Sequence, residues 1–204
     1  MPFKLTSSAI FLILANVVPI FGVLYWGWDA TAILVLYWLE SVIMGLLNVP
    51  KILACRQTEE GSIVSALGNL FVAGFFSVHY GMFTFVHGTF LAEMFGARSM
   101  MEGLLSGGTI FWTAVTFLIS HLFSMFINFF GKKEYLGRET GKQMMSVYGR
   151  VFVMHFVIIL GGFAVQAFGA PVLAVVMLII LKTVIDLAAH KKEHRDPITT
   201  ETLL

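Results

Sequence analysis

The side chains that could carry chemistry in this sequence are ionisable groups set inside long apolar stretches. They are Glu40, His79, His121, His155 and Asp186. A charged side chain at the centre of a membrane helix costs about 2.5–3.5 kcal/mol on insertion scales, so such residues face partners inside a helical bundle. Neutral imidazole and carboxylate groups suit zinc, iron or manganese, and such a site needs no cysteine. The sequence therefore predicts a divalent transition-metal site built from these five residues.

These side chains also fall at similar depths. Counting from the expected helix ends at about 1.5 Å per residue, the glutamate and the three histidines reach the central third of a hydrocarbon layer about 30 Å thick. Lys182 reaches this depth on the last helix, where we expect it to pair with Asp186. The residues expected to support the site or relay protons are Lys182, His87, Asn48 and Asn128. No local motif such as H-E-x-x-H backs the site, so the prediction depends on separate helices converging.

The composition is that of a membrane protein. Of the 204 residues 58% are hydrophobic and 12% are charged, about half the charged share of an average soluble domain. A net charge of +1 with no basic face argues against nucleic acid as a partner. The single cysteine, Cys55, excludes an internal disulfide and any cysteine-based metal motif.

Hydropathy divides the chain into apolar segments, each near or above the roughly 20 residues that cross a bilayer. They cover about 7–28, 31–52, 63–91, 108–130, 148–168 and 171–190. The sequence therefore predicts an all-α bundle of about six transmembrane helices, forming one domain over residues 1–204.

The loops between these segments set the expected orientation. With the N-terminus inside, the positive residues on the cytoplasmic side are Lys4, Lys51, Arg56, Lys132, Lys133, Arg138, Lys142, Arg150, Lys191, Lys192 and Arg195. The opposite side holds only Arg98. Positive residues mark untranslocated loops, so both termini are expected in the cytoplasm and the protein in the inner (plasma) membrane. Arg150 and His155 lie about 140° apart around their helix and are expected to have different surroundings.

Three short strings carry a family resemblance. They are Tyr37-Trp38-Leu39-Glu40-Ser41, His79-Tyr80-Gly81-Met82-Phe83 and Lys182-Thr183-Val184-Ile185-Asp186. With them the chain resembles an uncharacterised prokaryotic family of small multi-pass membrane proteins, a domain of unknown function. The resemblance covers most of the chain and implies a helical membrane fold. It implies no activity.

Several functions stay open on these residues. A metal site could be structural or catalytic, which leaves open whether the protein is an enzyme. A proton-coupled transporter or channel could use Glu40, His79, His121, Lys182 and Asp186 as a relay. A b-type haem could lie between His121 and His155. An accessory subunit, as a homo-oligomer or beside a membrane partner subunit, would use the polar residues only to hold helices together.

Overall fold

The computed structural model of the chain describes residues 21–56, 62–103, 106–169 and 171–195, with the side chains of the last helix described over 172–184. The helices are α2 (Ala30–Ala54), α3 (Ile63–Met94), α4 (Arg98–Glu102), α5 (Thr109–Ser124), the π-helical segment η1 (Met125–Gly131), α6 (Thr140–Met145), α7 (Tyr148–Phe168) and α8 (Pro171–Arg195). Over these ranges the only β structure is an isolated bridge between Arg56 and Leu136. The predicted all-α fold class is therefore confirmed.

Among the described residues, four segments are long and apolar enough to cross a membrane. They are Ala30–Ala54, Ile63–Met94, Thr109–Gly131 and Thr140–Phe168. α8 contributes a shorter apolar stretch, Val172–Val184. Most of the predicted segment 7–28 lies outside the described residues.

The helix ends follow from local chemistry. Asp29 caps α2, since its carboxylate accepts hydrogen bonds from the backbone N–H groups of Thr31 and Ala32 at 2.7 and 3.3 Å. Ser62 caps α3 in the same way through the N–H of Ser65 at 3.1 Å. α7 ends at Gly169, which has a φ of 62°, a left-handed conformation that glycine adopts without steric cost.

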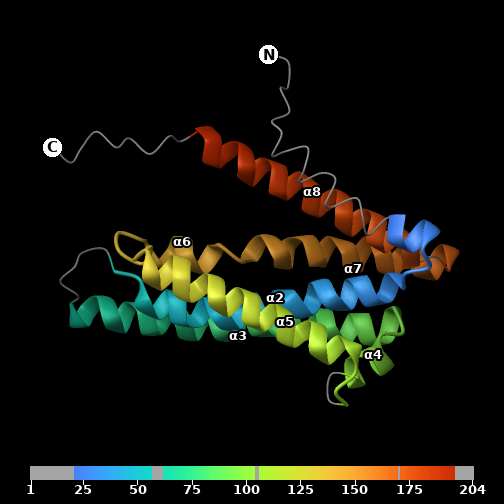
Figure 1. The fold of residues 1–204 in the computed structure, drawn as a ribbon, viewed down its shortest axis with the longest axis horizontal. Helices are drawn as coiled ribbons and strands as arrows, with labels where there is room; N and C mark the ends of the chain where they lie inside the picture. Colours follow the sequence, from blue (N-terminus) through green and yellow to red (C-terminus); the bar gives the residue numbers. More distant parts are fainter. Residues whose placement is uncertain (1–20, 57–61, 104–105, 170, 196–204) are drawn as a thin grey trace.

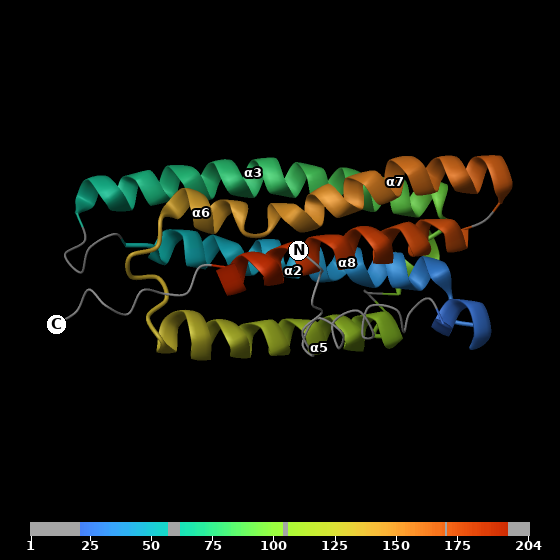
Figure 2. The same cartoon turned by 90° about the horizontal axis from the view of Figure 1, so that it is seen from above.

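α2 lies at the centre of the bundle. It packs against α3, α5 and α8, while α7 lies against both α3 and α8 (Figures 1 and 2). The main core joins Leu34 and Val35 of α2 to Leu91, Val157 and Val175 from three other helices. In the most apolar part of each span, 50% of the residues of α2 are buried, against 6% for Thr109–Gly131. α5 is thus the most loosely packed span in the described part of the chain.

The connection between α5 and α7 folds back onto the bundle. The backbone N–H of Arg56 donates to the carbonyl of Tyr135 at 2.9 Å, and the N–H of Gly137 donates to the carbonyl of Arg56 at 2.7 Å. α6, which the sequence did not predict, follows and packs against α2 and α3. The predicted helix 108–130 is also interrupted, since its last turns form η1.

Candidate functional site

A charged cluster joins three helices near the middle of α2. Glu40 on α2 is the shared partner of His121 on α5 and Arg150 on α7. Nε2 of His121 lies 3.1 Å from Oε1 of Glu40, and Nη2 of Arg150 donates to Oε2. Each carboxylate oxygen therefore has its own nitrogen partner, and each partner comes from a different helix.

The guanidinium of Arg150 is fixed by further contacts. Its Nε donates to Oγ of Ser41 at 3.1 Å, and its plane lies over the ring of Tyr37, 4.6 Å from the ring centroid. Oγ of Ser41 in turn donates to the carbonyl of Tyr37 at 2.7 Å, and Oη of Tyr80 donates to the carbonyl of Ser41 at 2.8 Å. Stacking and hydrogen bonds together set the direction in which the guanidinium meets Glu40.

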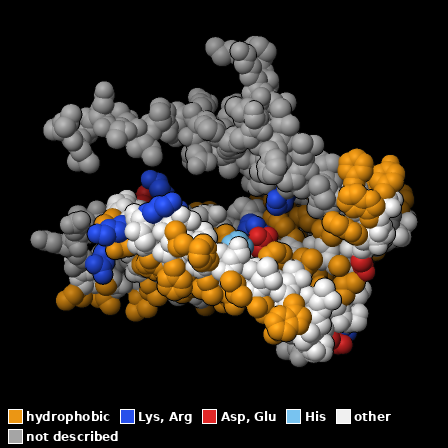
Figure 3. Space-filling view, in the orientation of Figure 1, with side chains coloured by type: hydrophobic (Ala, Val, Ile, Leu, Met, Phe, Trp, Pro, Cys, Tyr) orange, Lys and Arg blue, Asp and Glu red, His pale blue; other side chains and the backbone are white. Residues whose placement is uncertain are grey.

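The cluster is enclosed but not sealed. The side chains of Glu40, His121 and Arg150 are 24%, 27% and 21% exposed. Figure 3 shows acidic, basic and histidine side chains together about midway along the molecule, beside patches of hydrophobic side chains. Part of the surface of each charged group is therefore left uncovered by the rest of the protein.

The charges of the cluster change with one proton. With a neutral imidazole, the negative Glu40 and the positive Arg150 cancel. A proton on His121 leaves one net positive charge, whereas a proton on Glu40 removes the attraction to both partners. The net charge of the cluster therefore depends on one proton, which either of two hydrogen-bonded groups can hold.

The remaining predicted histidines lie elsewhere, between α3 and α7. Nδ1 of His79 is 2.8 Å from Oη of Tyr148, and the His79 ring stacks on Phe75. His155 faces His87, with 3.4 Å between Nδ1 of His155 and Nε2 of His87.

The predicted metal site is therefore not assembled as expected. Of the four proposed ligands whose side chains the structure describes, only Glu40 and His121 meet, because the helices turn His79 and His155 toward other partners. Within the described part of the chain, no group of three or more His, Cys, Asp or Glu side chains could hold a metal ion. The Asp186 side chain, and with it the expected pairing to Lys182, lies outside the described residues.

The residues predicted to hold a haem also lie apart. His121 bonds to Glu40 of α2 and His155 to His87 of α3, so each imidazole is turned toward a different helix. Of the predicted supporting residues, Asn128 donates from Nδ2 to Oγ of Ser124 on its own helix at 3.2 Å.

Sequence reasoning missed Arg150 as a member of the site. It lies in the predicted segment 148–168, two residues after the start of α7 at Tyr148, but it was counted with the positive residues of the cytoplasmic side and not with the site. The sequence did contain a signal for this partner, namely the carboxylate of Glu40. A membrane-embedded Glu40 needs a cationic partner, and Arg150 is the arginine nearest in expected depth.

A second polar network, made of neutral groups, lies nearer the Cys55 end of α2. Nε2 of Gln143 donates to Oδ1 of Asn48 at 2.6 Å, and Nδ2 of Asn48 donates to the carbonyl of Gln143 at 3.2 Å. Oγ1 of Thr140 donates to Oδ1 of Asn69 at 2.6 Å, and Nδ2 of Asn69 donates to the carbonyl of Cys55 at 2.7 Å. These bonds tie α6 to α2 and α3.

Comparison with known proteins bears on the family and not on the activity. No curated protein and no solved structure matches the chain. A family model does match, over residues 2–201, in agreement with the resemblance seen in the sequence. The chain belongs to this family, DUF6498, a family of unknown function.

Proposed function

We propose that this protein is a proton-coupled transporter or channel of the inner (plasma) membrane, with Glu40, His121 and Arg150 as its proton-binding centre. The observation that carries the proposal is the sharing of the Glu40 carboxylate between His121 and Arg150. The proposal includes six membrane spans with both termini in the cytoplasm, supported by the distribution of Lys and Arg between the loops.

The position of α5 supports a coupling between protonation and movement. α5 has α2 as its main packing partner and is the least buried span of the described chain. The hydrogen bond between His121 and Glu40 is therefore a substantial part of what attaches α5 to the bundle. A proton taken up or released at this contact changes its charges and therefore how firmly α5 is held against α2.

The π-helical segment supports the same interpretation. η1 begins four residues after His121, and the backbone N–H of Met125 points at the carbonyls of both His121 and Leu122. π-helical turns occur frequently at functional sites, since their wider ring can shift by a residue without breaking the helix. A helix built this way can change its register beside the charged cluster.

A metal ion at this cluster is disfavoured by Arg150. The guanidinium already occupies one oxygen of the carboxylate and places a permanent positive charge against any cation that approaches. Glu40 and His121 alone would supply two ligands, whereas catalytic zinc sites use three protein ligands and structural sites four.

The test is a distance measurement between spin labels in the full chain in lipid nanodiscs. Labels are attached at Leu46→Cys on α2 and Phe123→Cys on α5, two exposed positions, in a Cys55→Ala background. We expect the α2–α5 distance distribution to differ between about pH 8 and pH 5, either side of the usual histidine range. Glu40→Gln and His121→Asn should each remove the difference.

A label pair at Leu46→Cys and Val78→Cys, which joins α2 to α3, is the matched control and should not respond to pH. The same α2–α5 distances at both pH values in the unaltered cluster would overturn the proposal. Proton flux into liposomes under an imposed membrane potential then separates the two classes, since a channel conducts protons alone and a transporter requires its substrate.

A further inference from the structure

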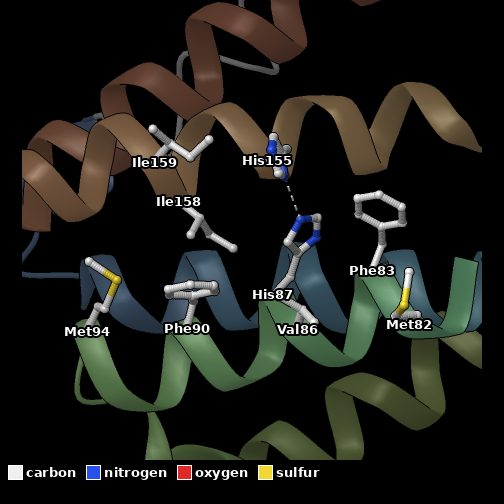
Figure 4. A pocket seen from close by; sticks show the side chains of 9 residues that line it. All are labelled: Met82, Phe83, Val86, His87, Phe90, Met94, His155, Ile158 and Ile159. Atoms are coloured by element: carbon white, nitrogen blue, oxygen red, sulfur yellow. Dashed lines mark hydrogen bonds between the residues drawn. The ribbon is translucent and has the colours of Figure 1, made fainter.

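A second candidate site lies between α3 and α7, apart from the charged cluster. A cavity of about 320 Å³ opens there, and seven of its nine lining residues are apolar. Its two polar members, His87 and His155, face each other across the gap between the helices (Figure 4). The volume is at the lower end of that of small-molecule sites, which begin near 300 Å³, and holds one ring-sized group.

The imidazole pair presents both kinds of hydrogen-bonding group. His87 is 3% exposed, and its Nε2 lies 3.4 Å from Nδ1 of His155. In the neutral pair, one imidazole donates to the other. Each ring has one nitrogen left outside this contact. Whichever ring donates, one of these two nitrogens carries a hydrogen and the other carries a lone pair. Among the described residues neither of these nitrogens has a hydrogen-bond partner, so the pair offers one donor and one acceptor to a ligand.

The lining excludes a charged ligand. None of the nine residues is Lys, Arg, Asp or Glu, so a phosphate, carboxylate or ammonium group would be buried without a counter-charge. Phe83 stands edge-on to His155, with 6.2 Å between ring centroids, and Phe90 adds a second aromatic face. The cavity therefore suits a flat, uncharged ring that carries oxygen atoms.

The approach to the cavity is from the lipid side. Its rim residues Met82, Phe90 and Ile159 are 54%, 44% and 54% exposed, and all belong to helices that can span a membrane. A ligand that enters there must be lipid-soluble, and an apolar tail can remain outside against the same surface.

We propose that this cavity binds a lipid-soluble quinone, with its ring between Phe83, Phe90 and the two imidazoles. A quinone carbonyl accepts a hydrogen bond from the remaining imidazole N–H. A hydroxyl of the reduced quinol donates to the remaining lone pair, so the pair fits both forms. This inference is independent of the proton-binding role of Glu40.

The test is saturable binding of radiolabelled decyl-ubiquinone to the full chain in nanodiscs. His155→Phe keeps the ring but removes both nitrogens, and should weaken binding about tenfold, the value of one hydrogen bond of about 1.4 kcal/mol. His155→Gln, which keeps a donor and an acceptor, should recover most of the affinity. Ile159→Trp fills the cavity and should abolish saturable binding.

Phe163→Trp is the matched control, because Phe163 is 68% exposed on the same helix and does not line the cavity. It should bind as the unaltered chain does. Two results would overturn the inference. One is the absence of saturable binding to the unaltered chain. The other is displacement of the quinone by decanol at equal concentration, which would make the cavity a groove for acyl chains.

Discussion

α2 carries two polar centres that differ in almost every physical respect. Around Asn48 the groups are neutral amides, hydroxyls and backbone carbonyls, and the side chains of Asn48 and Gln143 are 1% and 3% exposed. Around Glu40 the groups are charged or titratable and between a fifth and just over a quarter exposed. One centre is closed, being enclosed by the protein, and the other is open, with part of its surface left uncovered.

The Asn48 centre holds helices together, whereas the Glu40 centre is placed to respond to the surroundings. Neutral hydrogen bonds in a closed site do not change with pH, so the Asn48 centre fixes α6 between α2 and α3 permanently. The Glu40 centre links α2 to α5, the least buried of the described spans, through a contact whose charges a proton can change. The comparison predicts that damage at Asn48 lowers stability, whereas damage at Glu40 alters the pH response.

The largest effect on stability is expected from removing one charge of the open centre. Glu40→Leu leaves the Arg150 guanidinium without a counter-charge and should lower the free energy of unfolding by about 3 kcal/mol, the lower end for breaking a buried pair. The double variant Glu40→Leu/Arg150→Leu should recover most of that loss. Equilibrium unfolding in mixed micelles measures both, and equal destabilisation of single and double variants would contradict the ion pair.

Damage at the closed centre should cost somewhat less and leave the pH response intact. Asn48→Ala removes the hydrogen bonds to Gln143 and leaves buried polar groups unpaired, at a cost of about 2 kcal/mol. The α2–α5 spin-label distances should still change with pH. A loss of that change in Asn48→Ala would show that the two centres are not separate.

Gly45 lies between the two centres, and a substitution there tests how the packing of Tyr80 supports the Glu40 centre. A Cβ at this position would meet the ring of Tyr80, whose hydroxyl donates to the carbonyl of Ser41 beside Arg150. Gly45→Ala should displace that ring and lower stability by about 1–2 kcal/mol, the usual cost of overpacking. Tyr80→Phe, which removes only the hydroxyl, should separate the hydrogen bond from the clash in thermal unfolding.

The smallest effect is expected at Cys55, next to the closed centre. The thiol is 2% exposed, and burial raises its pKa, partly offset by the nearby Arg138. Less of it is therefore thiolate at neutral pH, and its alkylation by iodoacetamide should be slower than that of a free thiol and should accelerate as the pH rises. Rapid labelling at pH 7 would show that the closed centre opens.

Much of the fold could be predicted from the sequence because crossing a bilayer demands long apolar segments. The predicted segment 148–168 coincides with α7, and 31–52 and 63–91 fall short of α2 and α3 by only a few residues. α6 was missed because it is short and polar. Its burial depends on hydrogen-bond partners, Asn48 and Asn69, that lie on other helices.

The candidate site was predicted only in part. Depth along a helix follows from counting residues, and on this basis Glu40 and His121 were correctly expected to meet. Rotation about the helix axis depends on packing, which no single segment reveals. His79 and His155 therefore face the α3–α7 boundary, and Arg150, which was counted only among the cytoplasmic positive charges, is the partner of Glu40.

The backbone bridge between Arg56 and Leu136 has a mechanical consequence. It fastens the chain just after η1 to the end of α2, so this end of α5 cannot move far from the bundle. The opposite end, at Thr109, has no such tether to α2 in the described chain. Any movement of α5 away from α2 is therefore a rotation about the end that lies near Tyr135. Such a rotation opens the widest gap between α5 and α2 at the opposite end, near Thr109.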